Sequence, residues 1–155
     1  MKTTLRTDIT VRDICDGFVY NELEGKGLFG LSGKLVIQPE YQRNYIYADG
    51  KKDVAVIESV LNQYPLGLIY FNKVNDNLLE VLDGQQRTIS ICSFIVGEYM
   101  MLFDGNLLGF NNMTIEQQNR ILDYKLQIYI CEGTDEEKLK WFKTINIAGE
   151  KLKEQ

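Results

Sequence analysis

Hydrophobic and polar positions along this chain repeat with the periods of both helices and strands. Residues 49–63 place an apolar side chain every three or four positions, which predicts an amphipathic helix. Residues 66–74 and 78–82 are two β-prone runs separated by asparagine and aspartate, and they predict a hairpin. A second helical period covers residues 85–100. The segment 83–87 therefore lies on a strand-to-helix turn.

Three further helices and two further strands are predicted, and each of these helices begins at a threonine suited to an N-cap. The glycine-rich stretch 17–33 is interpreted as a loop with room for one short strand, and residues 104–112 as a second loop. The order indicates an α/β (α+β) domain with a small, mixed, mostly antiparallel sheet flanked by helices. The helices are expected at 10–15, 114–123 and 134–149, and the strands at 34–37 and 124–131.

Composition adds the expectation that residues 1–155 form a single domain. The chain is 45% apolar and 25% charged, as ordinary globular domains are, and no linker or low-complexity segment divides it. No apolar run approaches the ~18 residues of a membrane span, and no signal-like segment opens the chain. Its cysteines are odd in number and lie in apolar surroundings, so we interpret them as reduced thiols of a cytoplasmic protein. They are Cys15, Cys92 and Cys131.

The most restrictive count is that of histidine, which is zero. Its absence excludes Ser-His-Asp and Cys-His nucleophile pairs, a His-Glu-x-x-His zinc site and a histidine-dependent nuclease within this chain. Carboxylates, arginine, lysine, tyrosine, amides and the backbone remain available for chemistry. The net charge of −5 argues against non-specific nucleic-acid binding through bulk electrostatics, although it is compatible with a local basic cleft.

The strongest chemical signal is VLDGQQRT at residues 81–88. Gly84 allows backbone amides to converge at the turn, and the first turn of the following helix presents unpaired N–H groups at its positive end. Such a turn binds anions. Arg87 can add a bidentate contact to phosphate, Asp83 can hold a metal ion, and the two glutamines can position water. The plainer alternative is that Asp83 caps the helix, Gly84 permits the turn and the polar side chains face solvent.

A second cluster, Tyr41-Gln42-Arg43, follows the predicted strand at 34–37. By itself it is equally typical of a surface loop with an aromatic residue at its rim. If both clusters lie at neighbouring strand ends, Arg43 and Arg87 face one cavity, a geometry that suits a triphosphate.

These segments together resemble the N-terminal domain of GmrSD-type restriction and defence proteins, within the ParB/sulfiredoxin-like superfamily. The resemblance rests on YQRNY at 41–45, PLGLIYF at 65–71, VLDGQQRT at 81–88 and FKTINIAGEKLKEQ at 142–155, and it spans residues 10–155. It implies a domain that binds, and in several members hydrolyses, nucleoside triphosphates with a divalent metal. That activity would regulate the restriction of foreign, often modified, DNA.

The matched motifs imply a role for each residue, with Mg²⁺ as the expected cofactor and Asp83 as its ligand. A Phe-x-x-x-Asn segment of the family falls on Phe142 and Asn146. The catalytic residues implied are Asp83, Gln85, Gln86 and Arg87. The nucleotide-binding residues implied are Tyr41, Gln42, Arg43, Gly84, Thr88 and Asn146.

The expected function is a nucleotide-binding, NTP-hydrolysing regulatory domain of a restriction or anti-phage defence protein. The alternatives are a non-catalytic nucleotide- or DNA-binding assembly module and direct DNA binding by this domain. Because such proteins usually continue into a histidine-bearing nuclease module, the chain is expected to be a fragment of a longer protein, or else a compact stand-alone domain. Its expected partners are a nucleoside triphosphate and DNA, the latter through a longer protein or a nuclease partner. Sulfiredoxin-like chemistry fits poorly, because Cys92 lies well inside the helix rather than in the turn.

Overall fold

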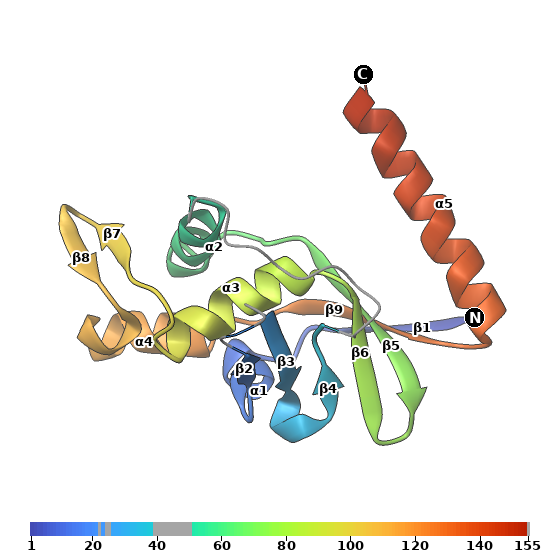
Figure 1. Cartoon of the computed structure of the whole chain (residues 1–155), viewed down its shortest axis with the longest axis horizontal. Helices are drawn as coiled ribbons and strands as arrows, with labels where there is room; N and C mark the ends of the chain where they lie inside the picture. The colour runs from blue at the N-terminus through green and yellow to red at the C-terminus, as the bar shows by residue number, and fades with distance from the viewer. Residues whose placement is uncertain (22, 24–25, 39–50, 155) are drawn as a thin grey trace.

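A computed structural model describes residues 1–21, 23, 26–38 and 51–154 of the chain. A seven-stranded mixed sheet forms its centre, in the order β1-β9-β5-β6-β4-β3-β2 (Figure 1). The pairs β9/β5 and β4/β6 are parallel and the other four neighbouring pairs are antiparallel. This confirms the predicted mixed, mostly antiparallel sheet. The strands are β1 (Lys2–Arg6), β2 (Val19–Asn21), β3 (Lys26–Gly30), β4 (Leu35–Val36), β5 (Leu68–Asn75), β6 (Leu78–Asp83) and β9 (Gln127–Glu132).

Five α-helices accompany the sheet in the described part of the chain, and α3 packs directly on it (Figure 1). Helices α1 and α2 contact α3, while α4 contacts both α1 and α2. Helix α5 follows β9 and extends away from the other helices (Figure 1). None of the described helices is long and apolar enough to cross a membrane. The helices are α1 (Val11–Cys15), α2 (Lys51–Leu61), α3 (Gln85–Ile95), α4 (Ile115–Leu122) and α5 (Asp135–Glu154).

The predicted threonine caps are confirmed. Thr10 and Thr114 each form a reciprocal capping box at the start of α1 and α4. The Thr134 hydroxyl accepts a hydrogen bond from the Glu137 amide at the start of α5. These caps depend on residues only three positions apart, which is why they are readable from the sequence.

Several strands were not predicted, and the reasons are physical. Strand β1 is mostly exposed and is held by its antiparallel ladder with β9 rather than by a buried face of its own. The glycine-rich stretch forms β2 and β3 rather than mainly a loop. A Cβ atom at Gly30 would lie 2.4 Å from the Ile14 carbonyl oxygen, so this glycine permits close packing of β3 on α1. The turn-rich segment before α4 likewise contains a hairpin, β7 (Met101–Phe103) and β8 (Asn106–Leu108), followed by a 3₁₀ turn, η2 (Phe110–Asn112).

Two helix ends also differ from the sequence expectation. Helix α3 ends at Ile95 instead of near Met100. The chain turns away just after the helix at Gly97, whose φ of 89° is typical of a glycine that ends a helix. Helix α5 continues to Glu154, past the end expected near Gly149. Helix boundaries are set by terminal hydrogen bonds more than by the hydrophobic period, so both errors affect ends rather than the elements themselves.

The core lies between α3 and one face of the sheet. Ile89 and Phe94 of α3 are fully buried, as are Phe71 of β5 and Val81 of β6 at 1% exposure or less. Each fully buried side chain of this kind contributes roughly 1.5–3 kcal/mol through the hydrophobic effect. The position of α3, and hence of the turn before it, is therefore fixed by the core of the domain.

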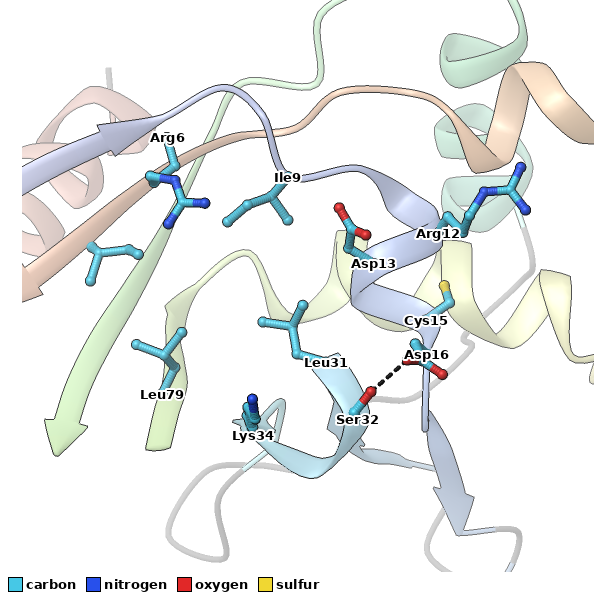
Figure 2. A pocket seen from close by; sticks show the side chains of 11 residues that line it. Arg6, Ile9, Arg12, Asp13, Cys15, Asp16, Leu31, Ser32, Lys34 and Leu79 are labelled. Atoms are coloured by element: carbon cyan, nitrogen blue, oxygen red, sulfur yellow. Dashed lines mark hydrogen bonds between the residues drawn. The ribbon is translucent and has the colours of Figure 1, made fainter. Parts of the chain in front are cut away.

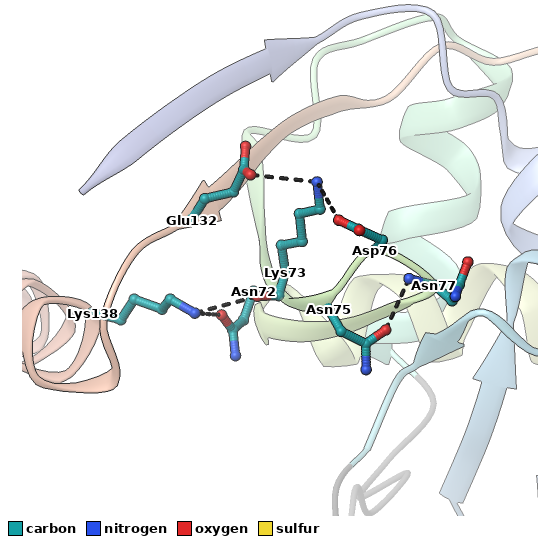
Figure 3. Close-up of polar contacts among 7 residues, drawn as sticks. All are labelled: Asn72, Lys73, Asn75, Asp76, Asn77, Glu132 and Lys138. Carbon is teal, nitrogen blue, oxygen red and sulfur yellow. Dashed lines mark hydrogen bonds and ion pairs between the residues drawn. The ribbon is translucent and has the colours of Figure 1, made fainter.

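The start of α5 packs on the opposite face of the sheet. The Lys138 ammonium donates to Asn72 Oδ1 at 2.6 Å, and the Asn72 amide donates in turn to Glu80 Oε1 at 2.7 Å. Figure 3 shows Lys138 reaching from α5 towards Asn72. The Trp141 ring meets Tyr70 edge-on with centroids 5.3 Å apart. Lys138 is only 8% exposed, so its charge depends on these oxygen partners.

We expect Lys138→Ala to lower the free energy of unfolding by about 1–3 kcal/mol, because it leaves the buried Asn72 carbonyl without its charged donor. The measurement is urea denaturation followed by circular dichroism. Lys140→Ala on the same helix is the control, since Lys140 is exposed and should change stability by less than about 0.5 kcal/mol. Equal midpoints for the two variants would contradict the role of Lys138 as an anchor.

Candidate functional site

The candidate site is built around Gly84, where β6 ends and α3 begins. Gly84 is the N-cap of α3 with φ 104° and ψ 14°, and no side chain caps the helix. A Cβ atom there would lie 3.0 Å from both branches of Ile69, which is 1% exposed. Glycine is therefore required by conformation and by space. The uncapped first turn leaves backbone N–H groups at the positive end of the α3 dipole.

Arg87 fastens this turn to the neighbouring strand. Its Nη1 donates to the Leu66 carbonyl at 2.7 Å, and its Nη2 donates to the Leu68 carbonyl at 2.9 Å. The Asp83 carboxylate lies 3.8 Å from the same guanidinium. Arg87 is thus a positioning residue that links the start of α3 to the start of β5. The Arg87 side chain is 25% exposed, so its positive charge at the turn can be reached from solvent.

Gln85 and Thr88 also bond to the backbone of the turn. Gln85 Nε2 donates to the Val81 carbonyl at 3.0 Å, and the Thr88 hydroxyl donates to the Gly84 carbonyl at 2.9 Å. Thr88 is 4% exposed. Its hydroxyl, which the resemblance assigned to nucleotide binding, here closes the first turn of α3. Gln85 likewise holds the end of β6 rather than extending into solvent.

Asp83 and Gln86 are the motif residues with the most exposed side chains. The Asp83 carboxylate is 58% exposed, and Gln86 is exposed on the first turn of α3. Together with the partly exposed Arg87, they place an anion, an amide and a cation around the helix N-terminus. A ligand at this turn would meet these three side chains and the helix amides.

The structure brings the ends of β4 and β6 together. These strands are neighbours and parallel, with Leu35 opposite Leu79 and Val36 opposite Glu80. Their carboxyl ends therefore lie at one edge of the sheet, and the chain beyond β4 can be followed to Gln38, which is 4% exposed. The neighbouring strand ends required for a shared cavity are thus present.

The remaining predicted residues are not placed by the structure. Tyr41, Gln42 and Arg43 lie outside the described residues. Asn146 belongs to α5, but its side chain is likewise outside them. The site that can be described consists of the turn and its anchors.

The sequence did not predict an open hollow of about 870 Å³ beside α1 (Figure 2). Asp83, Gln86 and Arg87 are not among the described residues that line it. Both of its arginines are bound to carboxylates, Arg6 to Asp8 at 2.7 Å and Arg12 to Asp123 at 3.1 Å. Nothing in the sequence indicated this hollow, because β1, the strand that carries Arg6, was not predicted. The lining includes Arg6, Ile9, Arg12, Asp13, Cys15, Asp16, Leu31, Ser32, Lys34, Leu79 and Ile130.

Comparison with known protein families gives a match to the description "GmrSD restriction endonuclease, N-terminal domain" over residues 26–155. The matched region runs from β3 to the end of the chain and includes the whole turn at 83–88. Comparisons with curated proteins and with solved structures gave no match.

We expect Gly84→Ala to destabilise the domain more than Gly97→Ala. Both glycines have positive φ, 104° and 89°, so both variants should lose about 1–2 kcal/mol from the strained backbone. A Cβ atom at Gly97 meets nothing within 4 Å, whereas the one at Gly84 presses on buried Ile69. Overpacking of this kind adds about 1–3 kcal/mol. Urea denaturation of the two variants measures the difference, and equal losses would show that the turn tolerates a side chain.

Proposed function

Because the chain belongs to the family of GmrSD restriction endonuclease N-terminal domains, we propose that it is a nucleotide-binding, NTP-hydrolysing regulatory domain. It would act in the cytoplasm as part of a restriction or anti-phage defence protein. The observation that carries this proposal is the uncapped N-terminus of α3, which follows β6 at a glycine and lies next to a parallel strand end. Helix N-termini of this kind bind phosphate through backbone amides and the helix dipole.

Side-chain hydrogen bonds hold the backbone of the turn in the unliganded chain, and this supports a binding role. Arg87, Gln85 and Thr88 hold its backbone through five carbonyl oxygens, those of Leu66, Leu68, Val81, Leu82 and Gly84. A preformed site loses little conformational entropy when it binds. Arg87 spends two of the five N–H donors of a guanidinium on these carbonyls. Its positive charge would attract the β- and γ-phosphates to the turn.

Asp83 fits the proposed role of Mg²⁺ ligand. Mg²⁺ is commonly held by one or two carboxylates together with phosphate oxygens and water, so a single exposed carboxylate beside a phosphate site is sufficient. The described residues contain no cluster of three or more histidine, cysteine, aspartate or glutamate residues, so the metal would come with the nucleotide. When bound, it would neutralise phosphate charge.

Hydrolysis would then depend on Gln86 and Arg87. Gln86 is exposed on the first turn of α3 and can orient water towards the γ-phosphate. Arg87 would stabilise the charge that develops in the transition state, and Arg43 would contribute from beyond β4. Phosphoryl transfer needs positioning and charge more than a histidine base, so it is compatible with a chain that has no histidine. Cleavage of DNA would belong to another domain or partner.

We expect nucleoside triphosphate with Mg²⁺ to raise the melting temperature of the chain, because a ligand at 100 times its Kd stabilises the folded state by about 2.7 kcal/mol. Asp83→Asn should lose the Mg²⁺-dependent part of the shift. Asp76→Asn, at the exposed β5–β6 turn, should retain it. The measurement is a thermal-shift panel of nucleotides with and without Mg²⁺. No shift with any nucleotide would refute the proposed site.

A non-catalytic binding module is the second candidate, and a specific observation favours it. Gln85 donates to two backbone carbonyls and Arg87 to two others, so two of the residues assigned to catalysis already have structural roles. A turn that is fixed in this way could hold a nucleotide or a DNA end to control assembly with a partner. Both candidates require binding at the turn, and they differ only in turnover.

Phosphate release distinguishes the two candidates. For an NTPase, we expect Gln86→Ala to slow release by about 10- to 100-fold, a loss of about 1.4–2.7 kcal/mol of transition-state stabilisation. Binding should persist, because the anchors of the turn are unchanged. Gln127→Ala, an exposed glutamine on β9, is the control and should leave the rate unaltered. Nucleotide binding without release by the wild-type chain would identify the binding module instead.

A further inference from the structure

Two cysteines that are far apart in the sequence meet between α1 and α3. Cys15 is the last residue of α1, Cys92 lies in the second half of α3, and 77 positions separate them. Their sulfur atoms are 2.7 Å apart, only about 0.7 Å more than the bond length of a disulfide. Helices α1 and α3 pack directly on each other, so the pair lies at a fixed interface.

The surroundings of the two sulfurs are unequal. Cys92 is 1% exposed, and burial raises the pKa of its thiol. Cys15 is half-buried and lies at the margin of the open hollow beside α1 (Figure 2). A small oxidant in solution therefore reaches Cys15 first. The Cys92 thiol is buried and stays protonated until Cys15 has reacted. The remaining cysteine, Cys131, is buried on β9.

We propose that Cys15 and Cys92 form a peroxide-sensitive thiol pair, which closes to a disulfide that joins α1 to α3. In the first step the Cys15 sulfur attacks hydrogen peroxide, the O–O bond breaks, and Cys15 sulfenic acid and water form. In the second step Cys92 attacks the sulfenic sulfur, the S–O bond breaks, and a second water leaves with the Cys92 proton. Two thiols are oxidised and one peroxide is reduced to two waters.

The bond would restrain the helix that carries the Gly84–Arg87 turn. Cys92 lies five residues after Arg87 on α3, and α1 is itself held by its capping box at Thr10. Closing a loop of this length limits the unfolded chain much more than the folded one. Oxidation therefore raises the melting temperature, and it does so whether or not the turn binds nucleotide.

The test treats the full wild-type chain with hydrogen peroxide and counts free thiols under denaturing conditions. The chain has three cysteines, and the expected count falls from three to one. The intact mass should fall by about 2 Da through loss of two hydrogens, and dithiothreitol should reverse both changes. Peptide mapping without reductant should recover one cross-linked peptide that contains Cys15 and Cys92.

Three variants make the result specific. Cys131→Ala should still form the bond and fall from two thiols to none. Cys92→Ala should stop at Cys15 sulfenic acid, which dimedone traps, and Cys15→Ala should keep both remaining thiols. The proposal is overturned if wild type retains three thiols under conditions that fully oxidise glutathione. Recovery of a bond to Cys131, or of a bond between two chains, overturns it equally. The wild-type measurements stand even if a variant fails to fold.

Discussion

The fold depends on how the start of α3 is held against the sheet. Arg87 donates from its two terminal nitrogens to the carbonyls of Leu66 and Leu68 at the start of β5, while Gly84 follows the end of β6. These two strands are antiparallel neighbours, so the guanidinium ties the helix that follows β6 to the other arm of the hairpin, β5. A guanidinium holds its two terminal donors in one fixed plane, a preorganised geometry that a lysine ammonium lacks. The turn and the buried stripe of α3 therefore act together to hold the helix on the sheet.

This anchoring gives most residues of the Asp-Gly-Gln-Gln-Arg motif a structural task. Gly84 supplies a conformation and a space, Gln85 and Arg87 supply hydrogen bonds, and only Asp83 and Gln86 are left largely to solvent. Structural and chemical roles are compatible here, because an anion site made of backbone amides requires a turn that cannot move. The same bonds that stabilise the turn would keep its N–H groups converging on one point.

How much the sequence predicts follows from the range of the interactions. Threonine caps and the β5–β6 hairpin depend on neighbouring residues, and they were predicted correctly. The strand pair β1/β9 and the approach of Cys15 to Cys92 join distant segments, so no local pattern reports them. The partners of Arg87 are backbone carbonyls, and because every residue has one, the sequence does not indicate which of them Arg87 binds. The motif thus located the strand-to-helix turn, but the division of its residues into anchors and solvent-facing groups required coordinates.

The parallel pairing of β4 with β6 relates the end of β4 to the turn that follows β6. Two parallel neighbours must end at the same edge, so the chain that leaves β4 and the turn that leaves β6 begin on the same side of the sheet. An antiparallel pairing would have sent them to opposite edges. In a chain with no histidine and a net charge of −5, an anion site would have to be assembled locally from amides, a helix dipole and arginine side chains. Strand direction is therefore the constraint that brings the end of β4 and the turn at Gly84 to one edge of the sheet.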